Sequence, residues 1–306
     1  MPGSGRQILI AANPKSGATE SGPKVAALNE SICSSGYQSQ VLYDLQEIAS
    51  LAPKLHAEGK LRAVIAAGGD GTADALANLL PHNIPLQLFP LGTENLLARY
   101  LGIKCEIDQA LEIVQSGESR QIDVGQANDK VFLVMASIGF DALVVQEMDA
   151  IRKGHINRWS YTKPILRAIR KYRFPQLRFQ VRESEGDEFR ELDSAAWGFV
   201  FNVPRYAASL EFCPQADPED GMLDLCQFSK GGLFFGTGYL TRLFFRKHQS
   251  MKGFSHSRCS EMKIQVVDGS EVPFQIDGDP GGLLPLHIKT LSKRLTLLVP
   301  RKPSSE

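Results

Sequence analysis

The chain has 306 residues, of which 43% are hydrophobic and 22% are charged. This composition is typical of a globular protein with room for two domains, and it excludes an intrinsically disordered chain. Lys plus Arg equals Asp plus Glu at 34 each, so the charge balance gives no support for a nucleic-acid-binding protein. No apolar run approaches the ~20 residues of a transmembrane helix. We therefore expect a cytoplasmic protein. Any contact with a membrane is expected to be peripheral, at the inner membrane surface.

The cysteines and histidines show no metal-binding or disulfide pattern. The five cysteines are odd in number and no two have the CxxC spacing, so we expect five free thiols in a reducing compartment. The six histidines lack the spacings of histidine metal sites, and no such site is expected. The cysteines are Cys33, Cys105, Cys213, Cys226 and Cys259.

The first part of the chain alternates short apolar runs with segments of helical periodicity. This alternation predicts βαβ units and a doubly wound parallel sheet. The expected strands are Gln7–Ala12, Ser39–Tyr43, Arg62–Ala67 and Pro85–Phe89. The expected helices include Pro23–Ser34 and Leu45–Glu58, with two more after the third and fourth strands.

The rest of the chain contains strand-like runs in succession, which predicts an antiparallel sheet or sandwich. Glu183–Glu188 is polar and acidic, and we expect it to be a hairpin loop. The expected strands are Val131–Ser137, Leu177–Arg182, Ala195–Asn202, Leu223–Phe228, Met262–Val267, Val272–Ile276 and Leu295–Val299. The expected helices are Ala142–Arg152, Ser160–Tyr172 and Leu233–Lys247.

A glycine-rich segment carries the strongest functional signal. Gly68-Gly69-Asp70-Gly71-Thr72 follows an apolar strand and precedes a helix, at the edge of the sheet where ligands bind. Glycines let a phosphate approach the backbone amides, and Thr72 is expected to cap the helix that follows. Asp70 would repel a phosphate directly, so we expect it to act through Mg²⁺. The alternative is a tight turn that binds no ligand.

Two further loops follow strands of the same predicted sheet. Asn13-Pro14-Lys15-Ser16-Gly17 offers amide, hydroxyl, backbone and ammonium groups to a phosphate. In the other, Thr93 is expected to be an N-cap, and Asn95 to bind a base, ribose or phosphate. Each loop alone is equally compatible with a plain helix entry. Together, three such loops at one edge predict a single ligand site.

These three loops, in this order, resemble the catalytic domain shared by diacylglycerol, sphingosine and ceramide kinases and their bacterial relatives. Segments of the second half resemble later motifs of the same family, so the resemblance covers nearly the whole chain. Gly-Gly-Asp-Gly alone is less specific, because NAD kinases and phosphofructokinases also carry it. The agreeing segments are Ser137-Ile-Gly-Phe-Asp141-Ala, Asn202-Val-Pro-Arg-Tyr206, Pro214–Leu225 and Gln275-Ile-Asp277-Gly-Asp279.

The resemblance implies the fold and the activity. It implies a nucleotide-binding α/β domain over 1–124, completed by 291–306 as the last strand returns, and a β-rich, sandwich-like lipid-substrate domain over 125–290. It also implies an ATP- and Mg²⁺-dependent kinase that phosphorylates the hydroxyl of a diacylglycerol, sphingoid base or related lipid. No nucleic acid is implied, and the oligomeric state stays open, with a homodimer among the options.

The resemblance also assigns roles to residues. The nucleotide is expected in the cleft between the two domains. The catalytic residues are expected to be Asp279, as the base, and Asp70. A structural metal is expected on Asp217, Asp220 and the carbonyl of Met222, although an acidic surface turn is an equally good interpretation. The residues expected at the ATP are Asn13, Pro14, Lys15, Ser16, Gly17, Gly68, Gly69, Asp70, Gly71, Thr72, Thr93 and Asn95.

The chain departs from the family pattern at three places. Ala73-Asp74-Ala75 stands where the family has x-Asn-Glu, Asp279 stands where it has Glu, and Tyr43-Asp44 stands where it tends to have Thr. Two alternatives stay open, an NAD kinase and a catalytically silent protein that binds a nucleotide or lipid, and the departures at Ala73-Asp74-Ala75 and Asp279 support the second. Two basic-aromatic segments, Arg167–Arg173 and Leu240–Lys252, are compatible with an anionic lipid surface or with half-buried helices.

Overall fold

The computed structural model describes residues 6–12, 21–151, 162–206, 210–231, 242 and 248–301. The chain forms two compact units. The first takes in Met1–Asp123 and Ser292–Glu306, and the second Val124–Tyr206 and Leu210–Leu291.

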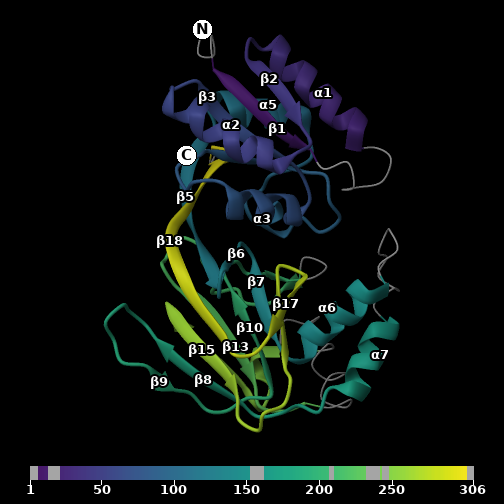
Figure 1. Cartoon of the computed structure of the whole chain (residues 1–306), viewed down its shortest axis with the longest axis vertical. Coiled ribbons are helices and arrows are strands. Elements are labelled where there is room, and N and C mark those ends of the chain that lie inside the picture. Colours follow the sequence, from purple (N-terminus) through teal and green to yellow (C-terminus); the bar gives the residue numbers. More distant parts are fainter. Residues whose placement is uncertain are drawn as a thin grey trace. The chain divides into compact units, whose positions relative to one another are not determined.

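The first unit is built on a parallel sheet whose strands lie in the order β2-β1-β3-β4-β18 (Figure 1). Parallel strands buried on both faces are nearly continuous apolar runs, as in β1, where every residue after Gln7 is buried. This confirms the predicted α/β fold. The strands are β1 (Gln7–Ala12), β2 (Gln38–Leu42), β3 (Leu61–Gly68), β4 (Leu86–Pro90) and the end of β18 (Leu286–Val299).

Helices cover both faces of this sheet. On one face, α1 and α5 share a buried apolar cluster with alternate residues of β1, Ile8 and Ile10. The helices α2 and α3 contact each other and β3, and they cover the opposite face (Figure 1). The bounds are α1 (Ser21–Ser34), α2 (Leu45–Ala57), α3 (Asp70–Leu79), α4 (Leu96–Tyr100) and α5 (Ile107–Ser116).

The second unit contains two antiparallel sheets, which confirms the predicted β-rich part. One has the strand order β14-β13-β10-β7-β16-β17, and the other contains β18-β15-β8-β9. In addition, β5 pairs with β18 and with β6. The strands not yet bounded are β5 (Glu118–Ala127), β6 (Lys130–Phe132), β7 (Met135–Ile138), β8 (Leu177–Arg182), β9 (Arg190–Glu191), β10 (Trp197–Phe201), β13 (Leu223–Phe228), β14 (Phe254–Cys259), β15 (Glu261–Val266), β16 (Pro273–Ile276) and β17 (Asp279–Leu283).

Helical and short elements complete the second unit. The helices α6 (Phe140–Ile151) and α7 (Thr162–Lys171) pack together through Val144, Met148 and Ala168. A short ribbon pairs β11 (Arg205–Tyr206) with β12 (Leu210–Glu211), and a 3₁₀ turn covers His248–Ser250. None of the helices in the described ranges is long and apolar enough to span a membrane.

The core of the six-stranded sheet is aromatic. The ring centroids of Phe199 and Phe212 lie 4.7 Å apart, and those of Trp197 and Phe228 lie 4.2 Å apart. Tilted and offset ring pairs of this kind add to the stability given by burial of the rings. Trp197, Phe199 and Phe201 stand at alternate positions of β10, so one face of that strand is aromatic.

Several elements differ from the sequence prediction. Val131–Ser137 is not one strand, because Asp277 binds the amides of Leu133 and Val134 between β6 and β7. The last strand begins nine residues earlier than predicted, at Leu286. β5, β14, β17 and α5 were not predicted. The predicted helix Leu233–Lys247 lies outside the described residues apart from Arg242. The predicted loop Glu183–Glu188 is confirmed between β8 and β9.

Candidate functional site

The glycine-rich loop of the first unit joins β3 to α3. Helix α3 begins at Asp70, and its N-cap is Gly69, which offers no side chain for capping. The prediction that Thr72 caps this helix is therefore wrong. Thr72 lies inside the first turn and is buried, and its side chain packs against the α-carbon of Gly68, where a β-carbon would stand 2.1 Å from the Thr72 hydroxyl oxygen.

The loops after β3 and β4 are packed against each other. The amide of Leu91 donates a 2.8 Å hydrogen bond to the carbonyl of Gly68. A β-carbon on Gly92 would stand 2.6 Å from the α-carbon of Gly69, closer than real side chains come. Gly71 differs from these glycines, because it is exposed and no atom lies within 4 Å of its absent β-carbon. Packing thus requires Gly68 and Gly92 and leaves little space at Gly69, whereas it does not explain Gly71.

Asp70 projects from the first turn of α3 to the start of α4. Its Oδ2 accepts a 3.1 Å hydrogen bond from the amide of Leu96. Burial raises the pKa of Asp70 above its ordinary value, against the opposite effect of the amides of Leu96, Leu97 and Asn95. Glu94 raises this pKa further, and no cationic side chain contributes among the described residues. The sequence did not indicate this capping role of Asp70.

The predicted role of Thr93 as an N-cap is wrong. Thr93 is exposed, and the N-cap of α4 is Asn95, whose φ of 48° lies in the left-handed region. The Asn95 amide group donates a 2.7 Å bond to the carbonyl of Gly92 and accepts a 3.1 Å bond from its amide. This reciprocal pair holds the loop after β4 closed. The predicted contact of Asn95 with a nucleotide stays a prediction.

A pocket of about 410 Å³ lies at the carboxyl end of β4 in the first unit. Its lining includes Pro90, Leu91 and Gly92 from the packed loop, and the basic residues Lys24, Arg99 and Lys104. Such a pocket has the size and charge to bind a phosphorylated small molecule. The loop Asn13-Pro14-Lys15-Ser16-Gly17, predicted to bind phosphates, lies outside the described residues.

In the second unit, the two carboxylates of the Asp277-Gly278-Asp279 turn have different surroundings. Asp277 accepts bonds of 2.7, 3.0 and 2.8 Å from the amides of Leu133, Val134 and Met135. Its φ of 49° lies in the left-handed region. Asp279 begins β17 and is exposed. Asp277 is therefore a structural residue of the turn, whereas Asp279 is accessible to a substrate.

A partly buried polar network lies beside this turn, and no role was predicted for it from the sequence. Asp141 accepts hydrogen bonds from the hydroxyls of Ser137, at 2.6 Å, and Tyr206. Gln275 connects Asp141 to the turn, because its Nε2 lies 3.4 Å from Asp141 Oδ2 and its Oε1 accepts a 2.8 Å bond from the amide of Gly278. Burial raises the pKa of Asp141, against the effect of the three side-chain hydrogen bonds. The motif residues of three sequence segments thus meet in one network.

The acidic turn predicted to hold a metal is exposed at both carboxylates. Asp217 accepts a 3.0 Å bond from the amide of Glu219, and Asp220 accepts a 2.9 Å bond from the amide of Met222. The guanidinium of Arg258 forms an ion pair with Asp220. The charge of Asp220 is therefore balanced by a side chain, and the metal at Asp217, Asp220 and Met222 stays a prediction.

One departure from the family pattern has a structural explanation. Tyr43 is 65% exposed, and Asp44 is the N-cap of α2, accepting a 2.8 Å bond from the amide of Gln46. These two residues start a helix and contribute nothing to the pocket. The other two departures, at Ala73–Ala75 and Asp279, lie in the segments described above.

Comparison with known proteins identifies the family. Residues 7–127 match the family model of the diacylglycerol kinase catalytic domain. Residues 134–299, more than half of the chain, match the family model of the YegS C-terminal NAD kinase beta sandwich-like domain. Together the two matches cover both units.

Individual relatives agree with these matches. A protein of Bacillus subtilis strain 168 named diacylglycerol kinase is 27% identical over 248 residues, which cover 79% of each chain. A Synechocystis protein is 26% identical over 242 residues, 78% of this chain but only 54% of that longer protein. A crystal structure from Bacillus anthracis str. Sterne superposes with a TM-score of 0.71 at 20% identity, covering 96% of this chain and 95% of that one. At that identity the likeness shows the fold alone. The chain belongs to the diacylglycerol kinase catalytic-domain family of lipid kinases.

Proposed function

We propose that this protein transfers a phosphoryl group from ATP to the hydroxyl of a membrane lipid, such as a diacylglycerol or a sphingoid base. The observation that carries the proposal is the pair of interlocked glycine loops beside a basic pocket in the first unit. Relatives named diacylglycerol kinase support the lipid acceptor. The identity of the lipid depends on the shape of its binding surface, which no motif in the chain specifies.

The first unit supplies the groups that bind phosphate. The first amides of a helix have no acceptor within the helix. Because Gly71 has no side chain, a phosphate could approach the amides at the start of α3 closely. Lys24, Arg99 and Lys104 add positive charge at the neighbouring pocket. In phosphoryl transfer, such groups position the nucleotide and stabilise the charge that develops in the transition state.

Asp70 is suited to binding Mg²⁺. It is a partly buried carboxylate whose pKa is raised by burial, and no cation balances it among the described residues. A hard divalent cation prefers such oxygen ligands and would supply charge neutralisation at the phosphates when bound. The hydrogen bond from Leu96 occupies Oδ2, so Asp70 would offer Oδ1 or share Oδ2.

Asp279 is the proposed base. A lipid hydroxyl has a high pKa, so a positioned carboxylate must accept its proton as the bond to phosphorus forms. Asp279 is exposed, and the turn that carries it is fixed by Asp277 and by the bond from Gly278 to Gln275. Asp is one methylene shorter than the Glu of the family pattern, by roughly 1.5 Å. Pro280, Gly281 and Gly282 follow Asp279 directly within β17.

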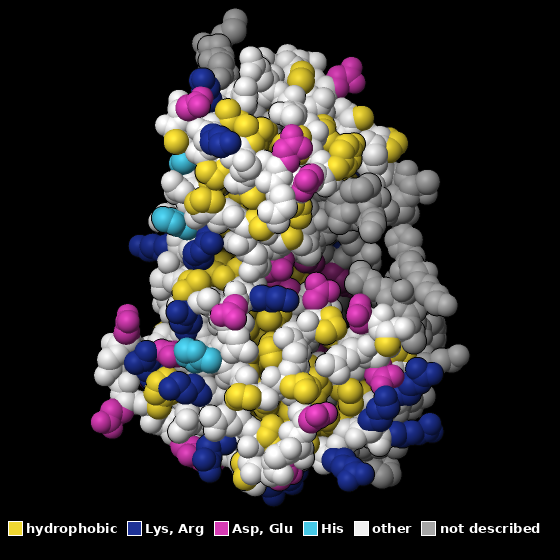
Figure 2. All heavy atoms as spheres, viewed as in Figure 1, with side chains coloured by type: hydrophobic (Ala, Val, Ile, Leu, Met, Phe, Trp, Pro, Cys, Tyr) yellow, Lys and Arg dark blue, Asp and Glu magenta, His cyan; other side chains and the backbone are white. Residues whose placement is uncertain are grey.

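A basic face on α7 supports peripheral membrane contact. Figure 2 shows Lys and Arg side chains gathered over this helix. Arg167, Arg170 and Lys171 are exposed, and only the first and last of these share an anionic partner, Glu147. A cluster of this kind attracts anionic lipid head groups, at about 1 kcal/mol per basic residue near the surface. The proposed acceptor is a membrane component, so such contact would bring the enzyme to its substrate.

The test is an assay of ATP consumption by the purified protein with Mg²⁺. Parallel reactions contain vesicles with diacylglycerol, sphingosine or ceramide, or else NAD without lipid. We expect ATP consumption that depends on one of the lipids. Consumption with NAD alone would favour an NAD kinase, the class of enzyme that gives its name to the sandwich-like domain matched by residues 134–299. No consumption with any acceptor would favour a catalytically silent binding protein.

A further inference from the structure

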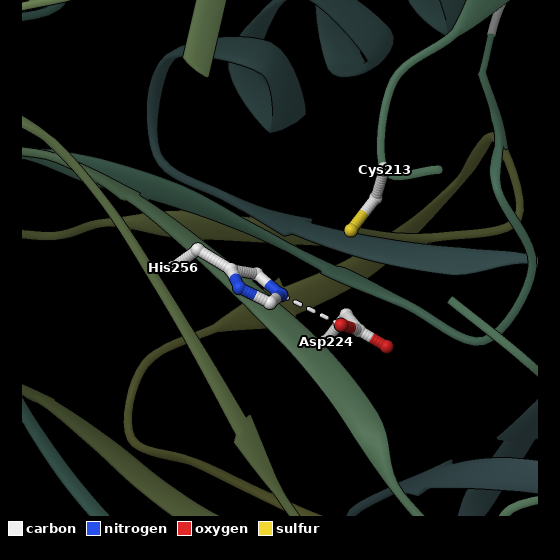
Figure 3. A group of neighbouring side chains, drawn as sticks. All are labelled: Cys213, Asp224 and His256. Atoms are coloured by element: carbon white, nitrogen blue, oxygen red, sulfur yellow. Dashed lines mark hydrogen bonds and ion pairs between the residues drawn. The ribbon is translucent and has the colours of Figure 1, made fainter. Parts of the chain in front are cut away.

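Three potential metal ligands, Cys213, Asp224 and His256, converge in the second unit, and Cys226 lies beside Cys213. Asp224 and Cys226 lie two residues apart on β13, so their side chains point to the same face of the sheet. His256 on β14 is the direct cross-strand partner of Cys226. Cys213 comes from the loop after β12 and faces these strands. Figure 3 shows the Cys213 sulfur, the His256 imidazole and the Asp224 carboxylate turned toward one another.

The distances between the ligand atoms are short. The ligand atoms of Cys213, Asp224 and His256 all lie within 4.8 Å of one another, and His256 Nε2 is 2.6 Å from Asp224 Oδ1. The sulfur of Cys226 is 3.9 Å from the sulfur of Cys213. Cys226 is therefore a neighbour of Cys213, whereas the group whose ligand atoms all lie within 4.8 Å of one another is Cys213, Asp224 and His256.

Burial makes this cluster unusual. Cys213 and Cys226 are 0% exposed and Asp224 is 1% exposed. Asp224 Oδ2 has no hydrogen-bond partner within the described ranges. A buried carboxylate oxygen without a partner is costly, by roughly 1–3 kcal/mol or more. The hydrogen bond to His256 alone leaves that cost in place, whereas a cation bound to the carboxylate would compensate it.

We propose that Cys213, Asp224 and His256 form a site for a divalent metal ion of the zinc type, with Cys226 beside Cys213. Thiolate and imidazole ligands select zinc over Mg²⁺ and Ca²⁺, which prefer oxygen. The burial of Cys213 and Asp224 is a feature of a structural site. Such an ion would fix the loop that carries Cys213 to β13 and β14.

Binding exchanges protons for the metal and involves no oxidation. The proton between His256 Nε2 and Asp224 and the proton of the Cys213 thiol leave to solvent as the bonds to the metal form. Cys213 is close to its ligating form already. Hydrogen bonds from Cys226 and then His256 lower the pKa of the Cys213 thiol to about 7, against the effect of burial.

No metal site is predicted at these residues from the sequence. The spacing 213, 224 and 256 matches no short motif, because the ligands come from a loop and two neighbouring strands. The cross-strand register of β13 and β14 and the loop that carries Cys213 bring them together. The metal site is independent of the proposed kinase activity, since none of the three residues belongs to the proposed phosphate or acceptor machinery.

The zinc content of the full-length protein tests this proposal. The chain is incubated with Zn²⁺, desalted and analysed by inductively coupled plasma mass spectrometry. We expect about one zinc ion per chain, and a loss of at least tenfold in affinity in Cys213→Ser and in His256→Asn. Cys259→Ser is the matched control, because Cys259 is equally buried on β14 but lies outside the cluster, and it should retain the metal.

A spectroscopic measurement on the wild type covers the case in which a variant fails to fold. Co²⁺ in place of zinc should give thiolate charge-transfer absorption and the visible bands of a tetrahedral ion. The proposal is overturned if the wild type binds neither Zn²⁺ nor Co²⁺, or if Cys259→Ser loses the metal as Cys213→Ser does. A disulfide between Cys213 and Cys226 in freshly purified protein would also overturn it.

Discussion

Gly92 and Gly69 touch through their backbones, since a β-carbon on Gly92 would stand 2.6 Å from the Gly69 α-carbon and 2.7 Å from Asn95 Oδ1. Two loops from successive strands are therefore interlocked, and each holds the other in place. The phosphate-binding geometry proposed for the first unit depends on this contact.

Gly92→Ala should force the two loops apart. Overpacking of this kind costs about 1–3 kcal/mol, so the melting temperature should fall in a thermal unfolding experiment. Gly71→Ala is the control, because nothing lies within 4 Å of its added methyl group. It should melt like the wild type but bind ATP more weakly in calorimetry. Equal melting temperatures for Gly92→Ala and the wild type would show that the loops separate without cost.

Asp70→Asn should lower the turnover rate on the order of 10²-fold, because it removes the charge proposed to bind Mg²⁺. The Asn oxygen can still accept the hydrogen bond from Leu96, so the melting temperature should change little. Asp44→Asn makes the same chemical change at a carboxylate that caps α2, and turnover should be unaffected. If both variants turn over like the wild type, Asp70 serves only to cap α4.

Asp277 and Asp279 should give opposite phenotypes, although they lie two residues apart. Asp279→Ala should remove nearly all turnover and leave ATP binding and stability intact, while Asp279→Glu should keep substantial activity. Asp277→Ala leaves three amides without their acceptor and should destabilise the fold by several kcal/mol. Kinetic assays and thermal unfolding of the three variants check this. Wild-type turnover in Asp279→Ala would place the base elsewhere.

Asp141 should make the stability of the protein depend on pH. Burial raises its pKa in the folded state, so the folded protein binds this proton more tightly than the unfolded chain does. Its contribution is present in full below the ordinary carboxyl pKa of about 3.9 and is lost as the pH rises through the raised value.

Asp141→Asn has no such proton and should therefore gain stability relative to the wild type between pH 4 and pH 8. Melting temperatures at both ends of that range measure the effect. Asp149→Asn, at an exposed position of the same helix, should show no such trend. A constant difference between Asp141→Asn and the wild type across that range would mean that Asp141 does not titrate in this window.

Much of the fold could be predicted because local pattern and tertiary structure agree. β1, β8 and β13 have the predicted bounds, since each is a compact apolar or alternating run between turn residues. The strand β17 could not be predicted, because Pro280, Gly281 and Gly282 are typical of a turn. In the structure Gly281 is required there, because its β-carbon would collide with the ring of Phe274.

The candidate site was predicted less completely. The order of loops after strands indicated the edge of the sheet where phosphate-binding residues are proposed, and a pocket lies at the end of β4 on that edge. The roles of Thr72 and Thr93 were wrong, because capping depends on where each helix begins, which sequence patterns locate only approximately. The network around Asp141 could not be predicted, since its members lie up to 138 positions apart in the sequence, from Ser137 to Gln275.

Product analysis tests the central claim most directly. The wild type, Asp70→Asn and Asp279→Ala are each incubated with Mg-ATP and vesicles of mixed membrane lipids, and the lipids are extracted and analysed by mass spectrometry. We predict that the wild type converts one class of lipid alcohol to its phosphate and that both variants form little or none. Conversion of NAD to NADP without lipid phosphorylation, or equal lipid phosphorylation by all three proteins, would contradict this account.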